Sequence, residues 1–125
     1  MNSSVPYLVR AIKEWVLDNG LTPYLVIDAT IREVDVPLEH VKDGRIILNI
    51  SPSAVRDFRV GSEGVFFSGR FSGVPREIFS PVSAIRGIFA KENGKGMWFS
   101  EDDHTPPTEP REDDSKGPPS LKLVK

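Results

Sequence analysis

Two histidines, His40 and His104, are the only imidazoles in this cysteine-free chain, so they are the first candidates for acid–base chemistry or metal binding. His40 follows Glu39, and His104 follows Asp102 and Asp103. Carboxylate and imidazole groups at this spacing could hold a divalent cation loosely, but a solvated run of charges gives the same pattern. We expect no metal site and no cofactor, since the lack of cysteine also excludes cysteine-based zinc and iron–sulfur centres.

No residue pattern typical of an enzyme is present either. The chain contains no Gly-x-Ser-x-Gly elbow, no Gly-x-x-x-x-Gly-Lys loop and no Gly-x-Gly-x-x-Gly fingerprint. Paired carboxylates occur between residues 101 and 114, where nothing would exclude water or shift a pKa. We therefore expect no catalytic residues and a binding protein rather than an enzyme.

Polar side chains inside otherwise apolar segments point to a binding groove. Asn49 interrupts an aliphatic segment, Ser51 follows on the same side, and Arg70 stands between Gly69 and Phe71. Amide, hydroxyl and guanidinium groups on strands can hydrogen-bond an extended peptide while apolar pockets take its side chains. Each residue also has a structural explanation, because Asn49 could satisfy a neighbouring backbone group and Arg70 could point into water.

The first element that could position these residues is a helix over residues 7–19. Ser4 can cap its first turn, Pro6 suits an early helical position, and Asn19-Gly20 tolerates the left-handed stop. Its apolar residues recur at the spacing of one helical face, and the arc is wide enough to cover both the chain's own sheet and a second subunit. Burial within a single domain explains the pattern equally well. The apolar residues are Leu8, Val9, Ala11, Ile12, Trp15, Val16 and Leu17.

Short β-strands separated by turns are predicted for the rest of the body. Asp43-Gly44 is a strong tight-turn signal, and Gly61–Gly64 and Asn93-Gly94 indicate further turns. One helix followed by several short strands predicts a mainly β fold, a small open barrel or sandwich with the helix packed on it. The expected strands are residues 24–30, 34–36, 45–50 as a central strand, 65–71, 76–80, 85–90 and 97–99.

Composition divides the chain into a folded domain, residues 1–100, and a C-terminal tail. The domain holds 12 Lys and Arg against 11 Asp and Glu, whereas residues 101–114 hold seven acids against Arg111. Residues 101–119 lack aliphatic and aromatic side chains, so we expect a disordered linker. Residues 120–125 are apolar again, as in a frayed terminus or a short docking motif.

The same features bear on location and partners. No apolar run could span a bilayer, and the start of the chain lacks the regions of a signal peptide, so we expect a cytoplasmic protein without membrane contact. The nearly neutral domain lacks the basic stripe that phosphate backbones require, so nucleic acid is not expected as a partner.

Extended stretches of the sequence resemble the stringent starvation protein B family. The stretches are Pro6–Ala11 with Trp15, Leu21–Thr30, Val36–Glu39, Lys42–Ile50, Gly69–Arg76 and Ile88–Gly94, and the C-terminal Pro119–Lys125 is also similar. The similarity covers nearly all of residues 6–99. His40 stands where the family has a tyrosine, Ser68-Gly69 replaces an Asn-Ala pair, and the linker is shorter.

The resemblance implies an Sm-like β domain that forms a homodimer and has no catalytic activity. Such a protein binds the ssrA tag, which trans-translation adds to stalled nascent chains, and delivers it to the ClpXP protease. The implied dimer residues are Leu8, Val9, Ile12, Trp15 and Val16, and the implied tag-binding residues are Leu38, His40, Val41, Asn49, Ser51, Phe67, Gly69, Arg70 and Phe71. An Sm-like RNA-binding protein is the alternative, because one barrel hosts many functions.

The resemblance also favours a docking motif over a frayed C-terminus. It implies that the last residues bind the N-terminal zinc-binding domain of ClpX. Apolar contacts would come from Leu121, Leu123 and Val124, while Lys122 and Lys125 would favour an acidic rim.

Overall fold

The computed structural model describes residues 3–100, so the expectations for the linker and the docking motif concern residues outside the described part. The α-helix α1 spans Val5–Asp18. Pro6 lies in its first turn, and Gly20, at φ 73°, follows its end as predicted. Ser4 takes the N-cap position, but its side chain makes no capping bond. The Val5 amide instead donates to the hydroxyl of Ser3 at 3.1 Å, one residue before the predicted cap.

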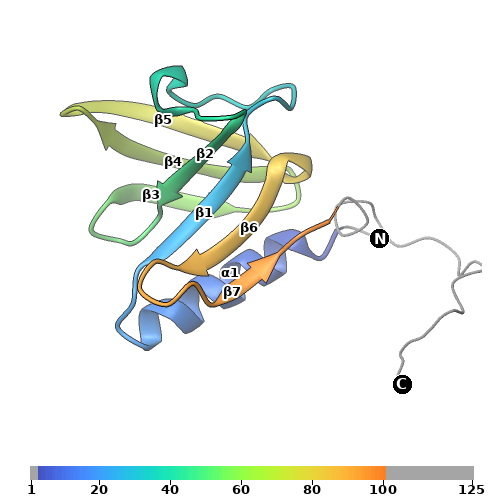
Figure 1. Ribbon diagram of the computed structural model, residues 1–125, viewed down its shortest axis with the longest axis vertical. Coiled ribbons are helices and arrows are strands. Elements are labelled where there is room, and N and C mark those ends of the chain that lie inside the picture. The colour runs from blue at the N-terminus through green and yellow to red at the C-terminus, as the bar shows by residue number, and fades with distance from the viewer. Residues whose placement is uncertain (1–2, 101–125) are drawn as a thin grey trace, which may run out of the picture.

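The buried face of α1 differs from the predicted one. Val5, Val9 and Val16 are buried, whereas Ala11 and Trp15 are exposed although their spacing assigned them to the same apolar face. Because apolar residues occupy most of the helix surface, their spacing does not decide which part of the arc meets the sheets. The helix packs against β1, β3 and β6 and lies at the bottom of the view in Figure 1.

Four strands form the first antiparallel sheet, in the order β2-β1-β6-β7 (Figure 1). The prediction of a central strand at residues 45–50 was wrong, because β2 lies at the edge of this sheet. Its side chains alternate between buried and exposed, and Ile47 is 54% exposed. The strands are β1 Pro23–Asp28, β2 Arg45–Asn49, β6 Ile85–Ala90 and β7 Gly96–Trp98.

Three strands form the second antiparallel sheet, in the order β3-β4-β5. Its edge strand β3 was missed by the sequence analysis, because Arg56, Asp57 and Arg59 interrupt its apolar pattern. Asp57 adopts a positive φ of 56° where the pairing with β4 shifts register, so the alternation is broken there as well. The strands are β3 Val55–Val60, β4 Gly64–Phe71 and β5 Val74–Pro81.

The strongest turn signals are confirmed. Asp43 and Gly44 have φ of 53° and 76°, and backbone bonds of 2.8 and 2.9 Å join Lys42 and Arg45 on either side. A positive φ at both central residues is the geometry that an Asp-Gly pair favours. In contrast, the expected strand at residues 34–36 is reduced to an isolated bridge between Asp35 and Phe79.

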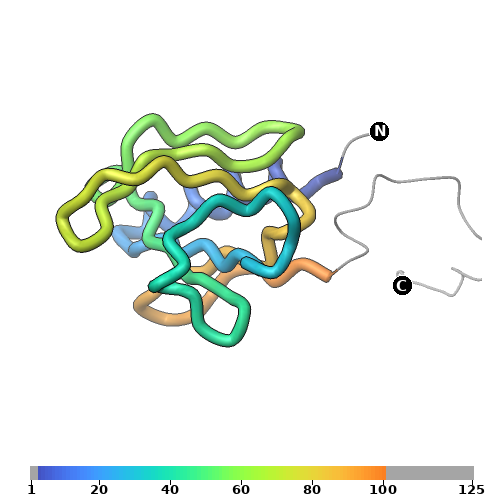
Figure 2. The backbone as a smooth tube through the Cα atoms, turned by 90° about the horizontal axis from the view of Figure 1, so that it is seen from above, coloured from blue at the N-terminus to red at the C-terminus, as the bar shows by residue number. Residues whose placement is uncertain are grey.

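The core lies between the two sheets and under the helix, and Figure 2 shows the second sheet along the upper side of the molecule. Two short 3₁₀ turns, η1 at Leu38–His40 and η2 at Val82–Ala84, complete the described elements. The mainly β fold with an N-terminal helix is thus confirmed. Within residues 3–100, no helix has both the length and the apolar character needed to cross a membrane. The largest fully buried core residues include Leu25, Ile27, Ile46, Ile50, Ile78, Ile85 and Ile88.

Candidate functional site

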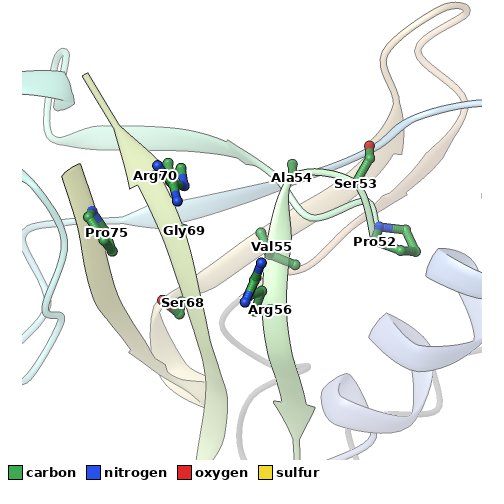
Figure 3. A pocket seen from close by; sticks show the side chains of 9 residues that line it. All are labelled: Pro52, Ser53, Ala54, Val55, Arg56, Ser68, Gly69, Arg70 and Pro75. Atoms are coloured by element: carbon green, nitrogen blue, oxygen red, sulfur yellow. The ribbon is translucent and has the colours of Figure 1, made fainter. Parts of the chain in front are cut away.

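A cleft of about 430 Å³ lies where β3 begins and β4 ends, and we call it the arginine cleft. The turn before β3 forms one wall, and the end of β4 with the neighbouring Pro75 forms the other (Figure 3). Two of the predicted groove residues, Gly69 and Arg70, line it. The full lining consists of Pro52, Ser53, Ala54, Val55, Arg56, Ser68, Gly69, Arg70 and Pro75.

Strand register brings the two arginines of the cleft onto one face. Arg56 of β3 pairs with Ser68 of β4, and Arg70 follows two residues further along β4. Residues two apart on a strand share a face, so Ser68 and Arg70 point away from the buried Phe67 side chain and from the core-facing side of Gly69. Both guanidinium groups are exposed and reach the same cleft.

The cleft carries positive charge that its own lining does not neutralise. None of its nine lining residues is acidic. Among residues 3–100, neither Arg56 nor Arg70 has a carboxylate within ion-pair distance, and the one ion pair that forms joins Arg86 and Asp28 in the first sheet. Glu77 lies across β4 from Arg56, opposite Ser68, and lines a separate hollow. The cleft therefore suits a ligand that brings carboxylate or other anionic groups.

Asn49 and Ser51 do not line the cleft, but their hydrogen bonds hold the turn that forms one of its walls. The side-chain oxygen of Asn49 accepts the Ser51 amide at 2.9 Å and the Ser51 hydroxyl at 2.7 Å. The Ser51 hydroxyl oxygen in turn lies 3.2 Å from that of Ser53, which lines the cleft. The structural explanation of Asn49, that it satisfies a neighbouring backbone group, thus applies. Its exposed side chain and the 8% exposed Ser51 hold the turn that leads from β2 into β3.

The turn η1 contacts the end of β4 beside the cleft. The rings of His40 and Phe71 lie 5.4 Å apart between centroids, and Phe71 directly follows Arg70. Leu38, at the start of η1, is 75% exposed, so a large apolar side chain is free to contact a ligand. Val41 is half-buried against the core. Phe71 shares the inner face of β4 with Phe67 and Gly69, so its ring lies on the opposite face of β4 from Arg70 and does not line the cleft.

Phe67 lies in the core rather than at the surface. It is 3% exposed and stacks on Phe58 with ring centroids 5.7 Å apart. Gly69 is also buried, and a Cβ at its position would lie 3.3 Å from the Phe71 ring. Phe67 therefore supports β4 from inside and Gly69 lines the cleft with backbone alone, so Arg70 is the predicted strand residue that brings a side chain into the cleft.

Several lining residues were missed by the sequence analysis: Pro52, Ser53, Ala54, Val55, Arg56, Ser68 and Pro75. Most of them belong to β3 or to the turn before it. Recognition of β3 as a strand paired with β4 would have placed Arg56 opposite Ser68 and beside Arg70. The alternation of Val55 with Arg56 was the available signal.

Comparison with known proteins settles the family. The model of the family described as "Stringent starvation protein B" matches residues 3–123. The chain belongs to the stringent starvation protein B family. It is 47% identical over 98 residues to a stringent starvation protein B homolog of Haemophilus influenzae, and the match covers 78% of this chain and 65% of that relative. The resemblance noted in the sequence is thereby confirmed, and the match spans just under two thirds of the relative's length.

The helix that the stringent starvation protein B resemblance assigns to the dimer has two distinct faces here. Val9 and Val16 are 0% and 2% exposed, so they face the chain's own core and leave no surface for a second subunit. Tyr7 and Trp15 are 60% and 49% exposed, and the half-buried Leu8 lies beside Tyr7. The outward face of α1 thus offers two large aromatic side chains for contact.

The other residues considered as site candidates are the possible metal ligands and the docking residues of the tail. No group of three or more His, Cys, Asp or Glu side chains within residues 3–100 could hold a metal ion. His104 and the predicted docking residues Leu121 to Lys125 lie outside the described residues.

Proposed function

We propose that this protein is an adaptor that binds ssrA-tagged polypeptides and tethers them to the ClpXP protease. Membership of the stringent starvation protein B family carries this proposal. The adaptor performs no chemical step. It raises the local concentration of tagged polypeptide at the protease, and capture by the unfolding pore becomes nearly intramolecular. This role requires a cytoplasmic location.

The arginine cleft supports the proposal as the place where the tag is held. An extended peptide needs hydrogen-bonding groups for its polar atoms and apolar surface for its side chains. Arg56, Arg70 and Ser53 supply the first, while the exposed Pro52 and Pro75 of the lining supply the second. The observation on which this assignment rests is that Arg70, implied by the family resemblance, lines a cleft together with Arg56, and that neither has an ion-pair partner among residues 3–100.

The outward face of α1 supports a homodimer. Trp15 and Tyr7 would lose their exposed surface in the contact, with Leu8 and Ile12 beside them. A dimer carries two tails, and two docking motifs add avidity to contacts that are individually weak. Each tail would bind the N-terminal zinc-binding domain of ClpX through Leu121, Leu123 and Val124.

Fluorescence anisotropy of a labelled ssrA-tag peptide tests the groove. Arg70→Ala should weaken binding about tenfold, which corresponds to about 1.4 kcal/mol, because a charge-assisted hydrogen bond or ion pair is lost. Arg32→Ala is the matched control, since Arg32 is exposed but does not line the cleft. An affinity that stays the same in Arg70→Ala combined with Asn49→Ala would show that the tag binds elsewhere.

Labelled single-stranded RNA in the same assay separates the adaptor from the Sm-like RNA-binding alternative. Binding through phosphate contacts falls steeply as salt rises, whereas tag binding through apolar and hydrogen-bonded contacts varies less. We expect tag binding that persists at physiological salt and no RNA binding there. The reverse result would replace the adaptor with the RNA-binding function.

A further inference from the structure

The arginine cleft has an excess of positive charge, and the chain itself carries complementary charge in residues 101–114. Arg56 and Arg70 line the cleft without an acidic neighbour in its wall and without an ion-pair partner among residues 3–100. Residues 101–114, immediately after the described part, contain seven acids against Arg111. We propose that this acidic stretch occupies the arginine cleft of its own chain and competes there with an incoming peptide.

The length of the stretch permits this contact. Fourteen residues span up to about 45 Å when extended. A folded domain of about 100 residues has a radius of gyration of about 13 Å, so the extended stretch is longer than the diameter of the domain, and its later acids, from Glu109 to Asp114, are the ones that can reach the cleft. A tethered segment of this kind has an effective concentration on the order of 1 mM. A self-contact with a dissociation constant near 1 mM would then occupy about half of the clefts.

The chemistry of the cleft favours carboxylates as its occupant. Guanidinium groups bind carboxylates through paired, charge-assisted hydrogen bonds. The hydroxyls of Ser53 and Ser68 add donors between and beside the arginines. Glu77 and Asp57 line a second hollow, which shares Ser68 with the cleft, and neither forms an ion pair with Arg56 or Arg70.

The inference deepens the proposed function by adding a selectivity device at the same site. A peptide that offers only negative charge has to displace a tethered competitor of the same kind. A tag with apolar side chains can also pack against Pro52 and Pro75 of the lining, and it gains contacts that the acidic stretch, which lacks aliphatic and aromatic residues, does not make. The self-contact would therefore weaken nonspecific acidic ligands more than it weakens the tag.

A full-length variant with all seven acids changed to their amides tests the competition without altering chain length. The changes are Glu101→Gln, Asp102→Asn, Asp103→Asn, Glu109→Gln, Glu112→Gln, Asp113→Asn and Asp114→Asn. A labelled glutamate-rich octapeptide is the first probe, and the ssrA-tag peptide is the second. At low salt the amide variant should bind the octapeptide at least about twofold more tightly than the natural chain, because its competitor is gone. The control variant, Thr105→Ala with Thr108→Ala, should bind like the natural chain.

Two further conditions test the mechanism: high salt tests whether the effect is electrostatic, and a cleft variant separates occupancy of the cleft from general repulsion by the tail. The advantage of the amide variant should vanish in 1 M salt, where the screening length is about 3 Å. It should also vanish when both chains carry Arg56→Gln. An equal affinity of the natural chain and the amide variant at low salt overturns the inference. An advantage that survives Arg56→Gln overturns it as well, because the acids would then act away from the cleft.

Nuclear magnetic resonance gives a readout that needs no tag. Between the natural chain and the amide variant, the backbone amides of Ser53, Arg56, Ser68 and Arg70 should shift, whereas those of the edge strand β7 should not. Shifts that grow with protein concentration would place the acidic stretch in another chain's cleft and overturn the inference. If these shifts appear but no chain binds the ssrA tag, the proposed function fails while the self-contact stands. If the tag binds but the shifts are absent, the self-contact fails alone.

Discussion

Asp28 links the first sheet to the loop after β1 through one carboxylate. It accepts the amide of Thr30 at 2.9 Å and pairs with Arg86 at 3.2 Å. The Thr30 hydroxyl bond, assisted by the Thr30 amide and Arg86, holds the pKa of Asp28 below its usual range, although partial burial opposes this shift. A lowered folded-state pKa stabilises the protein above the unfolded-state pKa of about 4, and this stability is lost as pH falls through the folded-state pKa.

Asp28→Asn should therefore lower the free energy of unfolding at pH 7 by about 1 kcal/mol, the scale of a partly exposed ion pair with hydrogen bonds. The difference from the natural chain should shrink as the pH is lowered from about 4. Urea unfolding at pH 7 and pH 3 measures both values. Glu39→Gln, at an exposed acid on η1, is the control. A penalty for Asp28→Asn that is as large at pH 3 as at pH 7 would contradict the electrostatic explanation.

Gly61 and Gly64 stand at the two ends of the turn between β3 and β4, and they differ in the space available for a side chain. Gly64 has a φ of 151°, and a Cβ there would overlap the Ser80 carbonyl oxygen of β5. Gly61, three residues earlier, has no atom within 4 Å of such a Cβ. Gly64→Ala should destabilise the protein by about 2 kcal/mol or more, while Gly61→Ala should stay within about 0.5 kcal/mol of the natural chain. Thermal unfolding of both variants checks this, and equal stability of the two would contradict the close packing of β4 on β5.

At the scale of elements, α1 has an inward valine face and an outward aromatic face, and the second is the one available to a partner. If the proposed homodimer forms through this face, Trp15→Arg should convert it to a monomer, because the guanidinium group would have to be buried without a partner. Sedimentation equilibrium measures the change. Trp98→Arg is the matched control, since Trp98 is 59% exposed and lies on β7 rather than on α1. Dimers that persist in Trp15→Arg would remove the helix from the interface.

The elements differ in how well their sequences predicted them, and the reason is physical. In β4, Val65 and Phe67 alternate with Phe66 and Ser68, so the period of two identified both the strand and its faces. The turn at Asp43-Gly44 was equally clear, because its φ values need such residues. The helix was found but its buried face was not, since apolar side chains surround most of it. Strand β3 was missed because a register shift and charged side chains break its alternation.

In the candidate site too, residues on regularly alternating strands were predicted, and residues that depend on strand pairing were not. Arg70 was predicted as a groove residue and lines the cleft, because its place in β4 could be read from a regular strand. Arg56 was not predicted, since it reaches the cleft only because β3 pairs with β4, and this pairing joins residues that are distant in the sequence. Local pattern identifies a strand face, but it does not say which other strand lies beside it. Ser51 and Phe67 were assigned to the groove and are buried, because residue type alone does not reveal which side of a strand the core covers.

At the scale of the whole molecule, the proposed adaptor keeps binding and delivery in separate parts of the chain. The cleft is built within residues 3–100, whereas the proposed docking residues Leu121 to Val124 lie some 20 residues further on. If those 20 residues behave as a flexible chain, their root-mean-square span is about 25 Å, which sets the distance over which a bound tag can be presented. Loss of the last residues should therefore affect one activity without the other.

A chain that ends at Pro119 should bind the ssrA-tag peptide with unchanged affinity but should no longer accelerate degradation of a tagged substrate by ClpXP. The acidic stretch remains in this variant, so any competition at the cleft is also unchanged. Full-length Leu121→Ser with Leu123→Ser should behave in the same way, because it removes apolar contact without shortening the chain. Ser120→Ala is the matched control and should accelerate degradation like the natural chain. Equal acceleration by the chain ending at Pro119 would contradict the docking assignment, whereas a loss of tag binding would show that the two parts of the chain are not independent.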